Sequence, residues 1–294
     1  MSSLSQTYRM DRSGPPATSW DDYCAAAVAE WAKLLAIRDP IDERIVHGFL
    51  VDNPCFLPGA YGTTTKSGHS PMHSVLFTEP VLPGLASKVP DFMWIAKSSD
   101  EITPVLIEIE SPSKKWFTVS NNQTSDFSQA HGQLAEWKAW FDDPTNVLVF
   151  KRDYQFADDA TFRERKISPK YVLIYGRRAE MENSKSRQSK KASLARQNEA
   201  LMTFDRLSPS HDTAYFLTAR VTPTGFVAAS FPPYIRLSPS AARDWWRIAG
   251  KISAVKHQKN MPPARATFLE RRIPYWDAWG KAGNHSVINM GDFE

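Results

Sequence analysis

A chain of 294 residues, of which 42% are hydrophobic and 23% charged, is typical of a globular protein with one large domain or two small ones. Its first residues lack the apolar segment of a secretory signal, and no apolar run is long enough to cross a membrane, so we expect a cytoplasmic protein. The net charge of +4 is compatible with a nucleic-acid partner but does not by itself indicate one. The two cysteines have no metal-ligand spacing, and we expect them to be reduced.

Two helices are predicted near the N-terminus. The first begins after Ser19, which is suited to capping, and is closed by Pro40. Its apolar stripe comprises Ala27, Trp31, Leu34 and Leu35. The second follows directly, with Asp39 placed to cap it and Asn53 to end it. Its apolar face comprises Ile41, Ile45, Phe49 and Leu50, and Glu43 lies beside that face.

A strand within VLFTEPVL and a hairpin formed by residues 89–96 and 105–110 are predicted next. Side chains alternate along a strand, so Glu108 and Glu110 share one face while Ile107 and Ile109 occupy the other. Two carboxylates on one face of an apolar strand repel each other and lose solvation. That cost is normally tolerated only when cations compensate it.

The rest of the chain predicts a helix from about Ser125 to Pro144 with Gln133 on its apolar face, and a buried strand at 171–176. A basic, serine-rich helical stretch follows at 177–196, and TAYFLTARV and GFVAASF suggest a late hairpin. AARDWWRIAGKISAV predicts a terminal helix, followed by a tail interrupted by prolines. Without repeats or a long linker, we expect one domain with appended ends: an N-terminal helical extension at 1–40, a nuclease-like domain at 41–235, and a helical or irregular extension at 236–294 packed on the core.

The order of these elements is that of the restriction-endonuclease-like core, an α/β fold whose central mixed β-sheet is flanked by helices. In that fold an acidic metal site lies at a bent strand pair. Phosphodiester hydrolysis needs an activated water and a neutralised pentavalent oxyanion, and a divalent cation held by carboxylates supplies both. Asp91 and Glu108 are the expected ligands of Mg²⁺ or Mn²⁺, with Glu110 as a further ligand or water-activating group.

Several segments between Asp42 and Leu207 resemble the PD-(D/E)XK nucleases and, more closely, the Shedu anti-phage nuclease domain. They are DERIVHGFLVDNPCFL, VPDFMWIA, VLIEIESPSKKWFT, SQAHGQLAEWKAWF and PKYVLIYGRR with the later LMTFDRL. The resemblance implies a metal-dependent defence nuclease that cleaves double-stranded phage or plasmid DNA inside bacterial cells, often as a homo-oligomer. It also implies site roles for Gln133, as the family's downstream glutamine, and for Glu43, as an N-terminal helix acid.

The sequence departs from the family pattern at Glu110, where the usual catalytic lysine would stand. The resulting ExE arrangement resembles certain active restriction endonucleases in which the second glutamate orients or deprotonates the water. A carboxylate cannot supply the lysine's positive charge, so a second metal or a displaced cation must do so. The candidates are Lys97, Lys114 and Lys115. Phosphate contacts to DNA are expected from Lys114, Lys115, Arg177, Arg178, Lys190 and Lys191.

Each of these residues also has a purely structural interpretation. Asp91 is a typical strand-opening residue, Glu110 a solvated strand end, Gln133 a core amide, and Glu43 a residue that stabilises its helix dipole. The basic stretch at 177–196 is also typical of a solvated helix face. The alternative function is therefore a catalytically decayed nuclease-like fold that binds nucleic acid or acts as a scaffold. A hydrolase of small phosphates would need a base-recognition loop, of which the sequence has no sign.

Overall fold

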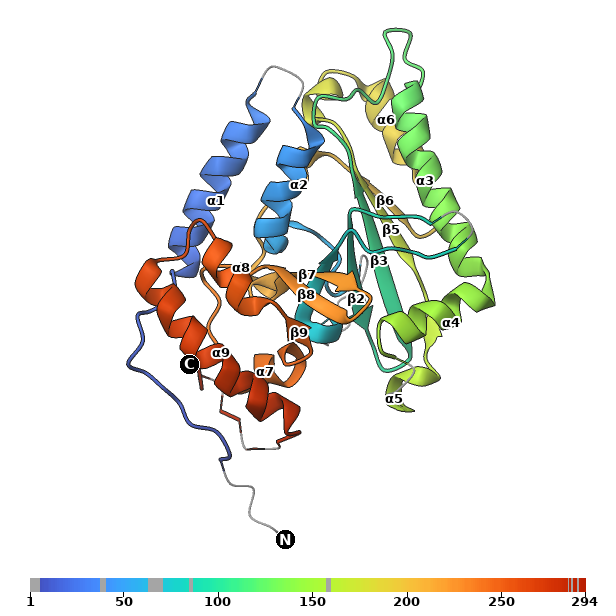
Figure 1. Cartoon of the computed structure of the whole chain (residues 1–294). Coiled ribbons are helices and arrows are strands. Elements are labelled where there is room, and N and C mark those ends of the chain that lie inside the picture. The colour runs from blue at the N-terminus through green and yellow to red at the C-terminus, as the bar shows by residue number, and fades with distance from the viewer. Residues whose placement is uncertain are drawn as a thin grey trace.

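A mixed β-sheet runs through the centre of the molecule, with helices on both of its faces (Figure 1). The computed structural model describes residues 6–37, 41–62, 71–84, 87–156, 160–284, 286, 288–289 and 291–294. Within them, nine strands form one sheet in the order β6-β5-β3-β2-β1-β7-β8-β9, with β4 beside β3. This arrangement confirms the expected α/β fold and is consistent with a restriction-endonuclease-like core.

The predicted hairpin forms the middle of this sheet. β2 (Phe92–Lys97) and β3 (Glu101–Ile109) pair antiparallel, with Phe92 opposite Ile107. β1 (Val75–Thr78) flanks β2, and β5 (Lys170–Ile174) runs parallel to β3, as does the short β4 (Lys166–Ile167). β6 (Glu199–Met202) forms one edge, and β7 (Leu217–Thr222), β8 (Gly225–Ser230) and β9 (Ile248–Ala249) extend the other side.

The two N-terminal helices are α1 (Trp20–Leu35) and α2 (Glu43–Asp52). Ser19 caps α1 as predicted, because its side chain accepts a hydrogen bond from the backbone N–H of Asp22. The predicted start of α2 is wrong: Asp42 caps it, whereas Asp39 and Pro40 lie outside the described residues. Ile45, predicted on the apolar face, points outward instead and is 51% exposed. Val46, Phe49 and Leu50 form the buried face instead.

The long helix α3 (Ser125–Asp142) is confirmed, with Thr124 as its N-cap. Pro144 does not lie in a loop beyond it but at the first position of α4 (Pro144–Asp153), which the sequence analysis missed. α5 (Ala160–Arg163) and α6 (Lys185–Leu194) follow. Short 3₁₀ turns occur at Pro54–Phe56, Met72–Ser74, Arg178–Glu180, Phe204–Arg206 and His211–Thr213.

The predicted terminal helix is wrong, because α7 (Pro239–Trp245) and α8 (Lys251–His257) are separated by β9 and Gly250. Gly250 has φ +73, and a Cβ there would lie 2.8 Å from Val227 Cγ1, so the turn needs glycine. The tail forms α9 (Pro263–Lys281) despite Pro274 inside it. The segment before α1 packs on α9, and Arg272 Nη2 donates to the carbonyl of Arg9 at 2.8 Å.

The two faces of the sheet carry different helices. His47 of α2 stacks on Phe92 with ring centroids 4.6 Å apart, so α2 covers the face that bears Phe92 and Ile107. On the opposite face, Tyr171 is paired with Leu106 and lies under Lys138 of α3, whose Nζ is 5.5 Å from the ring centroid. Among the described residues, no helix is long and apolar enough to cross a membrane.

Candidate functional site

Asp91 lies immediately before β2 and links the start of β2 to the end of β3. Its Oδ2 accepts a hydrogen bond of 2.8 Å from the backbone N–H of Ile109, the last residue of β3. Burial, and then the charges of Glu43 and Glu110, raise the pKa of Asp91 to about 7, although the hydrogen bond from Ile109 opposes the shift. The carboxyl group is therefore positioned by the backbone and surrounded by other acids.

Glu108 lies in β3 on the face covered by α3, because its register partner is Leu173 of β5, two residues beyond Tyr171. Its residue surface is 9% exposed, and its Oε2 is buried without a hydrogen-bond partner. Burial first, and then the charges of Asp91 and Glu110, raise its pKa to about 10. A buried carboxyl group without a partner is expensive unless a ligand or cation satisfies it.

Glu110 stands just beyond the end of β3, where its backbone N–H donates to the carbonyl of Ile174 at 3.0 Å. Its side chain forms an ion pair with Lys114 and a hydrogen bond with Glu43, the first residue of α2. Burial, followed by the charge of Glu110, raises the pKa of Glu43 to about 7. The structure thus brings Glu43 into the acidic cluster, which we define as Glu43, Asp91, Glu108 and Glu110.

Gln133 is carried by the helix that covers the Glu108 face. It lies between the buried residues Ala130 and Trp137 of α3, on the side of the helix that packs toward the sheet. Its Oε1 is buried without a hydrogen-bond partner. β3 and α3 meet at this face of the sheet, and each contributes one buried oxygen without a partner, from Glu108 and from Gln133.

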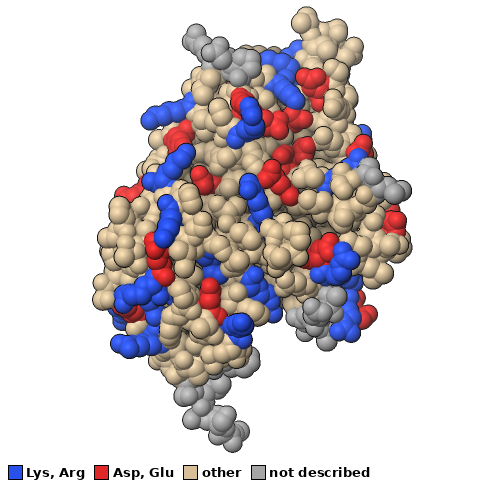
Figure 2. Space-filling view, viewed as in Figure 1, with Lys and Arg blue, Asp and Glu red and all other residues tan. Residues whose placement is uncertain are grey.

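The donor chemistry of the cluster fits a hard divalent cation. Carboxylate and amide oxygens are the ligands that Mg²⁺ and Mn²⁺ prefer, and the unpartnered Glu108 Oε2 is of that kind. In the part of the chain that the structure describes, no three or more histidine, cysteine, aspartate or glutamate side chains are arranged so that they could hold a metal ion. Figure 2 shows acidic side chains gathered on the upper part of the visible face, with basic side chains beside them.

The family model of the C-terminal region of the Shedu protein SduA matches residues 41–208. The chain belongs to the Shedu family. Membership implies a role in bacterial anti-phage defence. The matched segment contains the whole acidic cluster, together with Gln133 and Lys114. No curated protein matches the chain at a significant level.

Of the three lysines considered for this Shedu-family chain, the structure places one beside Glu110. The side chains of Lys114 and Glu110 are 35% and 13% exposed, and their ion pair closes one side of the cluster. Lys97 lies at the opposite end of β2, about 20 Å along the strand from Asp91, with its Nζ over the ring of Phe162. Lys115 is exposed. Lys114 alone of the three therefore contacts an acid of the cluster.

Three of the more distant cations expected to bind phosphate have partners within the protein. Arg177 pairs with Asp205 at 2.8 Å, and Arg178 is exposed. In α6, Lys190 Nζ donates to the carbonyl of Asn121 at 2.7 Å and Lys191 Nζ to that of Leu201 at 3.1 Å. Lys190 and Lys191 thus already hold neighbouring backbone, and their contacts with DNA stay a prediction.

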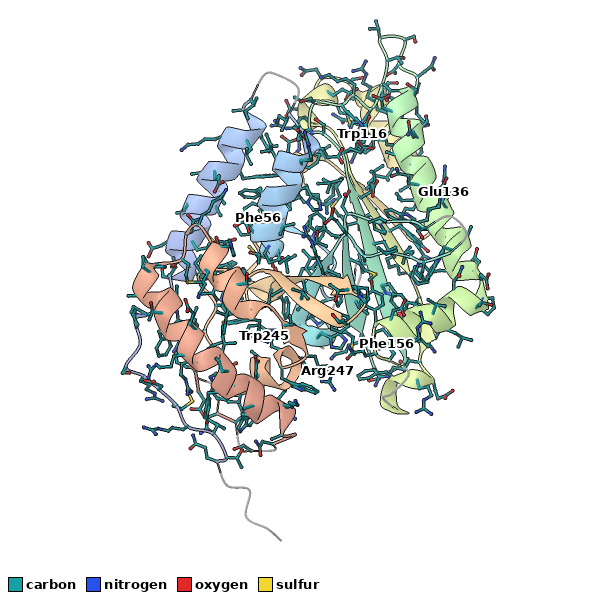
Figure 3. All side chains as sticks on the ribbon, in the orientation of Figure 1. Phe56, Trp116, Glu136, Phe156, Trp245 and Arg247 are labelled. Atoms are coloured by element: carbon teal, nitrogen blue, oxygen red, sulfur yellow. The ribbon has the colours of Figure 1, made fainter. Side chains whose placement is uncertain are left out.

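Glu180 supports the segment that follows the acidic strand, a role that the sequence analysis missed. Its carboxylate accepts hydrogen bonds from the backbone N–H groups of Trp116 at 2.9 Å and Phe117 at 2.8 Å. The Trp116 ring stacks on Phe127 of α3 with centroids 4.7 Å apart, and its Nε1 donates to the carbonyl of Tyr175. Figure 3 shows Trp116 at the upper end of the sheet. No local pattern marks Glu180, because its partners are more than sixty residues away.

Proposed function

We propose that this Shedu-family chain is a metal-dependent DNA endonuclease or nickase of the PD-(D/E)XK type. It acts on double-stranded phage or plasmid DNA in the bacterial cytoplasm and works as a homo-oligomer. The observation that carries the proposal is the unpartnered Oε2 of Glu108 among three further carboxyl groups at the end of β3. Burial and mutual repulsion favour the neutral forms of these carboxyl groups, and a hard divalent cation would favour their ionised forms and satisfy the unpartnered oxygen.

Asp91 and Glu108 would hold Mg²⁺ or Mn²⁺, with Glu110 as a third oxygen donor. Such a metal, when bound, activates water and neutralises charge that develops on the phosphate. Glu110 then orients the attacking water and accepts its proton at a carboxylate oxygen. Glu43, hydrogen-bonded to Glu110, is placed to share that proton. Gln133 Oε1, which has no other partner, accepts a hydrogen bond within the site and positions its contents.

Replacing Asp91 by Ala is expected to remove metal binding and cleavage together. The wild-type chain should show a rise in melting temperature with Mg²⁺ or Mn²⁺, because a ligand that binds only the folded state stabilises it, and should nick supercoiled plasmid. Asp91→Ala should lose the shift and slow nicking at least ~100-fold, since even groups that merely support metal ligands contribute up to that much.

Asp100→Ala is the matched control, because Asp100 is an exposed acid in the turn between β2 and β3. It should retain both the shift and the nicking. Normal nicking by Asp91→Ala would exclude the proposal.

Glu110 in place of the usual lysine favours one competing function, a decayed nuclease fold that only binds nucleic acid or a partner. In that case the wild-type chain would bind DNA without any metal-dependent shift.

Lys114 is expected to supply the positive charge that Glu110 cannot. Lys114→Ala should lower kcat for nicking by about 10²–10³-fold, the usual effect of losing one group that stabilises a developing oxyanion. KM for DNA should change little, because the Lys114 side chain is engaged with Glu110 inside the cluster. Lys115→Ala, in the exposed neighbour, should instead raise KM and leave kcat nearly unchanged. Equal kcat values in the two variants would refute this role.

A further inference from the structure

A short hairpin projects from the molecule just after the acidic strand. Phe117 and Gln123 form an antiparallel bridge, and Thr118 N–H donates to the carbonyl of Asn122 at 2.8 Å. Asn121 takes the left-handed conformation with φ +67, which closes the tip. Figure 1 shows this 117–123 hairpin as the projection at the top, beside α3 and α6.

The tip of the hairpin is exposed and uncharged, and it carries one large apolar side chain. Val119 is 102% exposed, the highest value among the large hydrophobic residues of the described chain that are exposed. Residues 116–124, WFTVSNNQT, contain no charged side chain, although 23% of the chain is charged. Figure 2 accordingly shows an uncharged projection at the top of the molecule. Such a surface has no cation to pair with phosphates, whereas an exposed valine beside amide side chains fits the bases of DNA, which offer stacking faces and hydrogen-bonding edges.

The hairpin is held in place by α6, although the Val119 side chain at its tip is bare. Arg187 of α6 donates to Asn121 Oδ1 at 3.0 Å and to the carbonyl of Thr118 at 3.1 Å. Ser186 accepts from Asn121 Nδ2 at 3.1 Å, and Lys190 holds the Asn121 carbonyl. The basic helix α6 is thus a brace for the hairpin. A braced loop can hold one exposed apolar side chain in a fixed position against a partner, which a mobile loop cannot.

The hairpin also lies close enough to the acidic cluster to meet the same stretch of DNA. Val119 lies nine positions after Glu110, so the backbone places the two at most about 30 Å apart. One turn of duplex DNA spans about 34 Å. We propose that the 117–123 hairpin is a wedge whose Val119 inserts between bases of a duplex within one turn of the scissile phosphate. This inference rests on the proposed nuclease function, and the wedge would bend the strand toward the acidic cluster.

The test uses the full chain and a short duplex in which several adenines are replaced by 2-aminopurine, whose fluorescence rises when it is unstacked. Binding is followed separately by anisotropy over a series of salt concentrations. Saturating wild-type protein should raise the fluorescence. Val119→Ser should reduce that rise several-fold with an unchanged dependence of affinity on salt, because no phosphate contact is lost. Val119→Leu, which keeps an apolar tip, should retain it.

Val28→Ser is the matched control, because Val28 is an exposed valine on α1 and should behave as wild type. An equal fluorescence rise in Val119→Ser and wild type would overturn the wedge while leaving nicking, and so the proposed function, intact. A Val119-dependent rise in a chain that never nicks would keep the wedge and refute the nuclease. A change in oligomeric state on Val119→Ser would overturn the wedge in favour of a contact between copies, and absence of DNA binding would overturn both.

Discussion

Glu108→Gln is expected to abolish metal-dependent nicking and, at the same time, to make the folded chain more stable. The amide cannot bind the metal as a carboxylate does, so nicking should fall at least ~100-fold. Stability should rise, most of all at alkaline pH, because the neutral amide cannot ionise, whereas ionisation of Glu108 is opposed by burial and by repulsion from Asp91 and Glu110.

The gain should depend on pH in a defined direction. The folded-state pKa of Glu108 is about 10, above its ordinary value of 4.5, so the folded state binds the proton more tightly than the unfolded state. The stability that this proton provides is complete below pH 4.5 and is lost as the pH rises toward 10. Glutamine keeps a neutral side chain throughout. The difference in free energy of unfolding between Glu108→Gln and wild type should therefore be larger at alkaline than at acidic pH.

Urea unfolding at two pH values, with a plasmid assay alongside, measures both effects. Glu101→Gln is the control, because Glu101 begins the same strand at its other end and is partly exposed. It should change neither nicking nor stability appreciably. A Glu108→Gln variant that is less stable than wild type at alkaline pH would contradict the account of the acidic cluster as a site of buried, uncompensated carboxyl groups.

Arg265→Met is expected to cost about 3–5 kcal/mol of stability, the usual effect of removing one partner of a buried ion pair. Arg265 is fully buried in α9, and its Nη2 donates to Glu294 Oε1 at 2.8 Å and to the carbonyl of Ile235 at 3.0 Å. Its Nη1 donates to the carbonyl of Pro15 at 3.1 Å. The guanidinium thus joins the segment before α1, the region after β8 and residue 294.

The midpoint of urea unfolding reports this loss directly. Arg271→Met provides the comparison on the same helix, since the Arg271 side chain is 63% exposed and its ion pair with Asp11 is screened by solvent and should contribute little to stability. Adding Glu294→Gln to Arg265→Met should recover part of the loss, because the Glu294 carboxylate would otherwise keep only the longer contact with the half-exposed Arg236, at 3.5 Å, to offset its charge. If Arg265→Met and Arg271→Met have the same midpoint, the buried arginine does not hold these three segments together.

Much of the site could be predicted because its pattern is local. The alternation of Glu108 and Glu110 with Ile107 and Ile109 follows from strand geometry alone, and the hairpin that brings Asp91 beside Ile109 joins segments adjacent in sequence. Ser19 could be identified as a cap for the same reason, since its partner is three residues away. The resemblance to the Shedu family, carried by the order of such local motifs, is confirmed by the family model.

Only the tertiary structure decided which distant groups meet. The contact of Glu43 with Glu110 and the bracing of the 117–123 hairpin by α6 each depend on how elements pack, which no local period encodes. The stability of α9 also depends on tertiary packing. An interior proline costs a helix about 3 kcal/mol or more, so Pro274 argues locally against a helix there. Burial of Phe268, Leu269, Ile273 and Trp276 against the rest of the chain outweighs that cost, and this burial exists only once the fold has formed.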